Sequence, residues 1–175
     1  MRKVVFAIMI CIFLAAGTGA FAADVARLVE ERTVTLYPEG QMLGNMVIGA
    51  RGKIQFIYVD GTLAKAVQDD PGSPDWLSWN VRHWGTDPAR GKALFIIRYE
   101  AYKPWSFSPG DLTIGGRNIE PGDILTRKAF IIEGELPNGT LGIIAAAVPS
   151  ETVQPGSPAV FGYSDASAEW TVPKK

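Results

Sequence analysis

The chain has 175 residues, a formal net charge of −1 and 47% hydrophobic residues, which suits one domain with a substantial core. This charge balance is not the basic excess that nucleic acids or anionic membrane surfaces attract, so we expect neither as a partner. The chain has one cysteine and one histidine, whereas a zinc site usually needs several such ligands. We therefore expect no disulfide, no zinc chemistry and no cofactor.

The first 22 residues have the features of a signal peptide. Arg2 and Lys3 precede an apolar run over residues 4–16, and Ala20-Phe21-Ala22 supplies the small residues of a cleavage site. The apolar run is shorter than the roughly 20 residues that span a bilayer. We predict cleavage after Ala22 or one residue later, leaving one mature domain over residues 23–175. That domain would have no transmembrane segment and would be periplasmic or secreted.

The first part of the mature chain alternates short apolar segments with turns. Asp24 as a cap and the spacing of Val25, Leu28 and Val29 favour a helix over 24–32, and β-branched residues predict a strand over 33–37. Residues 42–48 form a weak apolar segment interrupted by a glycine. A clear strand over 53–59 ends at an Asp-Gly turn, and we expect another short strand over 62–68.

One short helix interrupts this pattern. Ser73 is suited to the N-cap, Pro74 to the first helical position, and Gly85 to the position just past the end. Loops rich in Pro, Gly and Asp flank the helix on both sides. We predict an excursion between two strands of a β domain, spanning residues 69–91.

The stretch from Lys92 to Leu136 should form the centre of the fold, because it holds the longest apolar run. Within it we expect a strand, a Pro-Gly turn at 108–111, a second strand, a Pro-Gly turn at 120–123 and a third strand; the first and third cover residues 93–97 and 129–132. Further strands, also bounded by Pro-Gly and Asn-Gly turns, are expected over 141–148, 159–163 and 168–172. Eight or nine short strands in total predict an all-β, antiparallel sandwich or barrel with one short helix inserted between strands.

Part of this central stretch resembles a group of exported bacterial immunoglobulin-like domains of unknown function, often attached to lipoproteins. The matching pieces are Phe107-Ser108-Pro109-Gly110-Asp111-Leu112-Thr113-Ile114, then Ile119-Glu120-Pro121-Gly122-Asp123, then Ala129-Phe130-Ile131. They cover about 40 residues. The chain lacks the group's usual Asn after the first strand and its lipid-modified Cys. The resemblance implies an immunoglobulin-like β-sandwich and carries over no catalytic residue.

Aromatic residues are the best candidates for a ligand-binding site. Helical geometry places Leu77, Val81 and Trp84 on one face, where Trp84 is expected to plug the core. Trp79 falls nearly opposite, and Trp76 and His83 lie at the boundary. Trp105 follows a Pro bend. Tryptophan gives a large, rigid contact area, so we predict ligand binding by Trp76, Trp79, His83 and Trp105.

Other chemistries have weaker support in the sequence. The acidic residues around the helix are candidate calcium ligands, although they lack EF-hand spacing and suit turns and caps equally well; they are Asp69, Asp70, Asp75 and Asp87. A Ser-His-Asp triad would depend on His83, and no Gly-x-Ser-x-Gly motif accompanies it. We therefore expect no metal site and no catalytic residue.

These observations together predict a non-catalytic binding or structural module of the bacterial cell envelope. It would recognise a protein or a glycan through the aromatic helix and its loops, residues 69–91. Two alternatives remain. One is a peptidase inhibitor that acts through an exposed loop, and the other is a glycan-active enzyme with paired carboxylates in a cleft.

Overall fold

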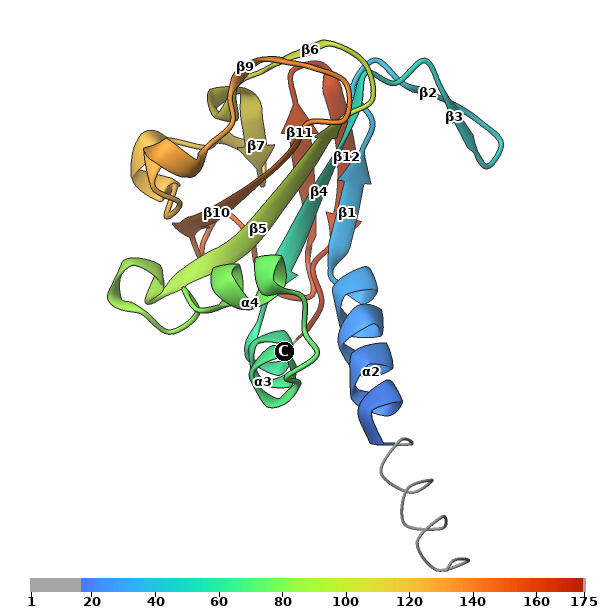
Figure 1. Ribbon diagram of the computed structural model, residues 1–175. Coiled ribbons are helices and arrows are strands. Elements are labelled where there is room, and N and C mark those ends of the chain that lie inside the picture. Colours follow the sequence, from blue (N-terminus) through green and yellow to red (C-terminus); the bar gives the residue numbers. More distant parts are fainter. Residues whose placement is uncertain (1–16, 175) are drawn as a thin grey trace, which may run out of the picture.

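The computed structural model describes residues 17–174 (Figure 1) and shows mostly strands in several antiparallel sheets. Two four-stranded sheets face each other, and three α-helices lie against one end of the first sheet. The prediction of an antiparallel β-rich fold that can be described as a sandwich is confirmed. The prediction of a single helix is wrong.

The first sheet contains the longest strands. Its order is β1 (Thr33–Leu36), β4 (Gly52–Val59), β5 (Lys92–Ala101) and β10 (Leu141–Pro149), all antiparallel to their neighbours. The apolar run predicted to organise the fold lies in β5, a central strand of this sheet. Both faces of β5 are largely buried, which explains why its sequence is continuously apolar rather than alternating.

The second sheet is built mainly from the C-terminal strands, in the order β12 (Ala166–Thr171), β11 (Pro158–Tyr163), β7 (Leu112–Ile114) and β8 (Arg117–Asn118). Two further pairs lie outside both sheets: β2 (Gln41–Leu43) with β3 (Met46–Ile48), and β6 (Trp105–Phe107) with β9 (Gly134–Leu136). The described chain thus has twelve strands, more than the eight or nine predicted.

Aromatic side chains fill the space between the two sheets. Phe56 and Phe95 of the first sheet both contact Phe161 of the second, with ring centroids 5.4 and 5.6 Å apart. All three side chains are completely buried. Aromatic pairs at such distances add to the stability gained from burial alone, so this layer is the main core of the domain.

The other face of the first sheet carries the helices α2 (Gly17–Glu31), α3 (Gly61–Asp69) and α4 (Asp75–Val81). They pack on Ile57, Val59, Leu94 and Ile96 and form a second buried cluster. Four short 3-10 helices complete the described chain: η1 (Asp87–Ala89), η2 (Pro109–Asp111), η3 (Pro121–Asp123) and η4 (Lys128–Phe130).

Asp60 joins the helices to the sheet. It follows β4 and is 1% exposed, and its Oδ1 accepts the backbone N–H of Leu63 (2.8 Å), which caps α3. Its Oδ2 accepts hydrogen bonds from Arg32 Nε (3.1 Å), at the junction of α2 and β1. Both charges are buried and paired, which is the arrangement that makes a buried ion pair tolerable.

The strand predicted over residues 62–68 is a helix, α3. The Asp-Gly dipeptide does not close a β-hairpin, because the Asp60 side chain caps a helix instead. Leu63, Ala64 and Val67 then fall on one buried helical face. The α4 helix begins at Asp75, and the N-cap is Pro74 rather than Ser73.

The strand predicted over residues 129–132 is also wrong. Residues 128–130 form η4, and the following residues have no regular structure. Phe130 is 69% exposed, so the apolar run does not lie in the core. In contrast, the predictions at 24–32, 33–37, 53–59, 93–97, 141–148 and 159–163 agree with the helices and strands found there.

The N-terminal prediction extends beyond the described structure. Residues 1–16, most of the predicted signal peptide, lie outside the described residues, and α2 spans the predicted cleavage position after Ala22. Within residues 17–174, no helix combines the length and apolar character needed to cross a bilayer.

Candidate functional site

Three of the four predicted ligand-binding residues lie on α4 or in the turn that follows it. Trp79 is 63% exposed, whereas Trp76 and His83 are half-buried. At 100° per residue Trp76 and Trp79 on α4 lie about 60° apart, and His83 follows in the turn after the helix. The exposure of Trp79 confirms its expected placement away from the core, and we call these three residues the aromatic stripe.

The opposite face of α4 fixes this stripe to the fold. Leu77 and Val81 are each 1% exposed and belong to the cluster between the helices and the first sheet. The Asn80 side chain donates a hydrogen bond to the carbonyl of Trp76 (2.6 Å). Because its buried face is held, a helix of only seven residues can present Trp79 in a defined position.

Trp76 lies between a charged group and an apolar depression. The Arg98 guanidinium lies 5.2 Å from the centre of the Trp76 ring, a cation–π geometry. Trp76 also lines a depression of about 340 Å³ between α2 and α4. The rest of its lining is mainly apolar and consists of Val25, Ala26, Val29, Asp70, Gly72, Pro74 and Leu77.

Arg98 belongs to a row of half-buried, mostly polar side chains on the face of the first sheet that carries the helices. The register aligns Thr35, Gln55, Arg98 and Ile143 across four strands, and all four side chains are half-buried. In the next row Lys53 Nζ pairs with Glu100 Oε2 (3.3 Å). The aromatic stripe therefore borders a polar surface, and we call Trp76, Trp79, His83 and Arg98 together the α4 surface.

His83 is uncharged at neutral pH, because burial lowers its pKa below the ordinary 6.5. Its backbone carbonyl accepts the hydroxyl of Thr86 (2.7 Å), which fixes the turn after α4. A neutral imidazole can both donate and accept a hydrogen bond. The side chain is therefore suited to contact a polar group of a ligand, with no triad or metal chemistry needed.

The fourth predicted residue, Trp105, is separate from the others. It lies in β6, is 5% exposed and packs against Phe107 and Tyr163, with centroids 5.3 and 5.1 Å apart. Its main role is in the core. It also lines a depression of about 400 Å³, together with Arg51 and the four acidic residues Glu39, Asp111, Glu135 and Asp165.

The predicted calcium candidates do not come together. Asp70 is buried, and its carboxylate accepts the backbone N–H of Gly72 (2.9 Å), while Asp87 pairs with Arg90 (2.6 Å). Asp75 lies in the first turn of α4, and Asp69 ends α3. Between Gly17 and Lys174 no three His, Cys, Asp or Glu side chains are grouped as metal ligands. These acids are better explained as turn, cap and ion-pair residues.

Sequence reasoning missed the residues that complete the α4 surface. Arg98 is 22 positions from Trp76, in the middle of an apolar strand, and only the strand register shows that it faces the helix side. A signal existed, because Gln55 and Arg98 each interrupt the apolar residues on either side of them in β4 and β5. The alternation was too short to assign a face without knowing the partner strands.

Comparison of the chain with family models, with curated proteins and with solved structures found no match.

Proposed function

We propose that the protein is an exported, non-catalytic binding module of the cell envelope that recognises a protein partner through the α4 surface. The observation that carries this proposal is Trp79, a large aromatic side chain that is 63% exposed on a helix whose other face is fully buried. Burying such a side chain in a complex removes a large apolar area from water. The entropy cost is small, because the helix that carries the side chain is already ordered.

The composition around Trp79 favours a protein over a glycan as the ligand. Trp and Arg are among the residues most enriched at protein-binding hot spots. Here Arg98 lies over the ring of Trp76, and Trp76 is on the same helix as Trp79, three residues before it. The depression lined by Trp76 is mainly apolar. The carboxylate of Asp70 in its lining already accepts a hydrogen bond from the backbone N–H of Gly72. An apolar side chain of a partner fits this depression better than a sugar, which needs free hydrogen-bonding groups.

The proposal is tested by placing a photo-cross-linking amino acid at position 79 in the cell that produces the protein. A discrete adduct with one envelope protein is expected. Trp79→Ala should weaken binding of that partner at least tenfold while leaving the folded state intact. A Phe130→Ala variant is the matched control, because Phe130 is equally exposed but lies on another element. Equal losses for both variants would contradict the proposal.

A second candidate, a glycan-active enzyme, is supported by the depression beside Trp105. Four acidic residues and Trp105 line it, and glycosidases use two carboxylates across a cleft. Glu39 is already paired with Arg51 (2.9 Å). Hydrolysis of envelope glycans that disappears in both Glu135→Gln and Asp111→Asn would favour this candidate. No structural observation favours the peptidase inhibitor.

We further propose that the two facing sheets are a variant of the immunoglobulin-like sandwich. The supporting pieces are the two Pro-Gly-Asp segments, which form η2 and η3, and the strand β7 that follows the first of them. An experimental structure with a different strand order between the sheets would contradict this description.

A further inference from the structure

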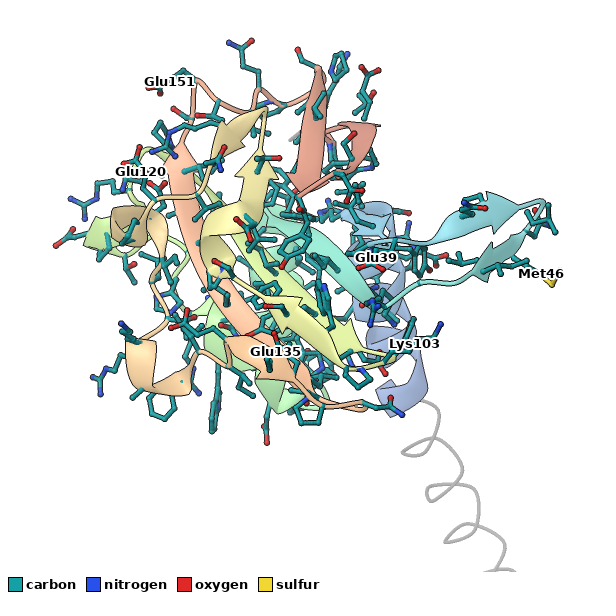
Figure 2. The ribbon with its side chains drawn as sticks, turned by 90° about the horizontal axis from the view of Figure 1, so that it is seen from above. Glu39, Met46, Lys103, Glu120, Glu135 and Glu151 are labelled. Atoms are coloured by element: carbon teal, nitrogen blue, oxygen red, sulfur yellow. The ribbon has the colours of Figure 1, made fainter. Side chains whose placement is uncertain are left out.

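The hairpin of β2 and β3 is the most exposed apolar feature of the described chain. None of its six strand residues is buried, and four of its large side chains are half exposed or more: Met42 (66%), Leu43 (62%), Met46 (62%) and Ile48 (50%). In both views the hairpin projects from the body, and Figure 2 shows Met46 at its tip. The hairpin precedes β4 in the chain and α4 follows it, and Figure 1 shows the hairpin and α4 near opposite ends of the first sheet.

We propose that this hairpin inserts into the surface of a phospholipid bilayer. The strand register pairs Met42 with Val47 on one face and Leu43 with Met46 on the other. Both faces are therefore apolar. A groove on a protein would cover one face of such a hairpin, whereas lipid surrounds both.

The charge distribution agrees with insertion of the tip alone. From Gly40 to Ala50 the chain has no charged residue. The first charges are at the base, where Arg51 Nε pairs with Glu39 Oε2 (2.9 Å) and the Arg51 guanidinium also donates to the carbonyl of Pro104 (3.0 Å). Figure 2 shows Glu39 and Lys103 near the base, away from Met46.

The length of the hairpin also fits insertion of the tip alone into the headgroup region. The four residues from Gly40 to Leu43 span roughly 14 Å, at about 3.4 Å per residue. Interfacial segments bury their apolar side chains roughly 5–10 Å into the headgroup and acyl boundary. The tip can reach that depth while the ion pair at the base stays in water. Deeper insertion would be costly, because β2 and β3 pair only with each other and their outer backbone groups are unpaired.

A second copy of the chain is a less suitable partner for this hairpin than a lipid surface. Two strands of three residues offer far fewer contacts than the roughly 20–30 residues per side of a stable protein interface. The base also lacks a cationic excess, because Glu39, Asp111, Glu135 and Asp165 line the depression that includes Arg51. Insertion should therefore depend on apolar burial, and anionic lipid should not be needed.

The test uses the full chain with Cys11→Ser, labelled with a polarity-sensitive dye at Met46→Cys. Phe130→Cys is the matched control, since Phe130 is exposed to a similar extent (69%). With phosphatidylcholine vesicles, the dye at position 46 should show a blue shift and the dye at position 130 should not. Adding phosphatidylglycerol should change the affinity less than about threefold. Because the readout is local to the hairpin, membrane contact elsewhere in the chain does not produce it.

A second set of variants measures the contribution of the side chains. The double variant Met42→Ser/Leu43→Ser, carrying the dye at position 46, should partition into vesicles about twentyfold less well or worse, and Phe130→Ser should partition normally. Four results would overturn the proposal. They are no shift at position 46, equal shifts at positions 46 and 130, binding only to anionic vesicles, and a concentration-dependent shift at position 46 without vesicles, which would indicate a second copy.

Discussion

The two ends of the first sheet each expose large apolar side chains, but on very different supports. At one end Trp79 is 63% exposed, and the helix beneath it has Leu77 and Val81 fully buried. At the other end Met46 is 62% exposed, and no strand residue around it is buried. A side chain on a fixed support suits specific recognition, because its position is set before binding. A side chain on an unsupported arm suits a fluid environment such as lipid.

The largest effect is expected from substituting Asp60, which joins the helices to the first sheet at the end that carries α4. Asp60→Ala removes the cap of α3 and takes from the buried Arg32 its buried ion-pair partner, leaving only the longer contact with Glu31 Oε2 (3.5 Å). We expect the free energy of unfolding in urea to fall by about 3–5 kcal/mol. Asp60→Asn can keep the cap but loses the charge, so its free energy of unfolding should lie between those of Asp60→Ala and the natural chain. A loss below about 1 kcal/mol would contradict the role given to Asp60.

The next test compares the two faces of α4. Leu77→Ala should lower the free energy of unfolding by about 2–5 kcal/mol, because it opens a cavity in the cluster between the helices and the sheet. Trp79→Ala should change it by less than about 0.5 kcal/mol, since Trp79 is exposed. Urea unfolding of both variants checks this difference. A large loss in Trp79→Ala would show that Trp79 supports the fold and would remove it from the binding surface.

The unsupported end should tolerate deletion. Removing residues 41–48 and joining Gly40 to Gly49 leaves the base intact, where the N–H of Arg51 donates to the carbonyl of Pro38 (3.1 Å). The melting temperature should change by only a few degrees, because no buried residue is lost. Differential scanning calorimetry checks this, and a cooperative loss of folding would show that the hairpin belongs to the core.

The smallest expected effect is a pH dependence that involves His83. Burial lowers its pKa, so the unfolded chain binds a proton at a higher pH than the folded one does. The stability that the neutral His83 contributes is therefore present above pH 6.5, and it is lost as the pH falls below that value. His83→Gln should show a smaller decrease in melting temperature between pH 7.5 and 5.5. Identical decreases in both chains would mean that the folded environment does not disfavour the charged imidazole.

The sequence predicted most strands correctly, because β-branched and apolar runs in this chain are bounded by clear turn residues. It also predicted the exposure of Trp79, since a seven-residue helix with Leu77 and Val81 on one face leaves little choice for position 79. Its errors have local causes. Asp60 is followed by glycine and resembles a hairpin turn, yet its side chain accepts the N–H of Leu63 and caps a helix.

The parts of the site that the sequence did not predict depend on contacts between distant segments. Arg98 lies over Trp76 only because β5 pairs with β4 and α4 packs on the same face. Trp105 was grouped with exposed aromatics, but the pairing of β6 with β9 places it against Tyr163 in the core. The apolar hairpin at 41–48 has a weak local signal, and its projection from the body cannot be inferred from composition.

The central claim is that the supported end recognises one protein partner, and a paired cross-linking measurement tests it most directly. The photo-cross-linker is placed at position 79 in one chain and at position 130 in another, both of which carry exposed aromatic residues in the natural protein. We predict a single discrete adduct from position 79 and none of the same mass from position 130. The same adducts from both positions, or none from position 79, would contradict the account.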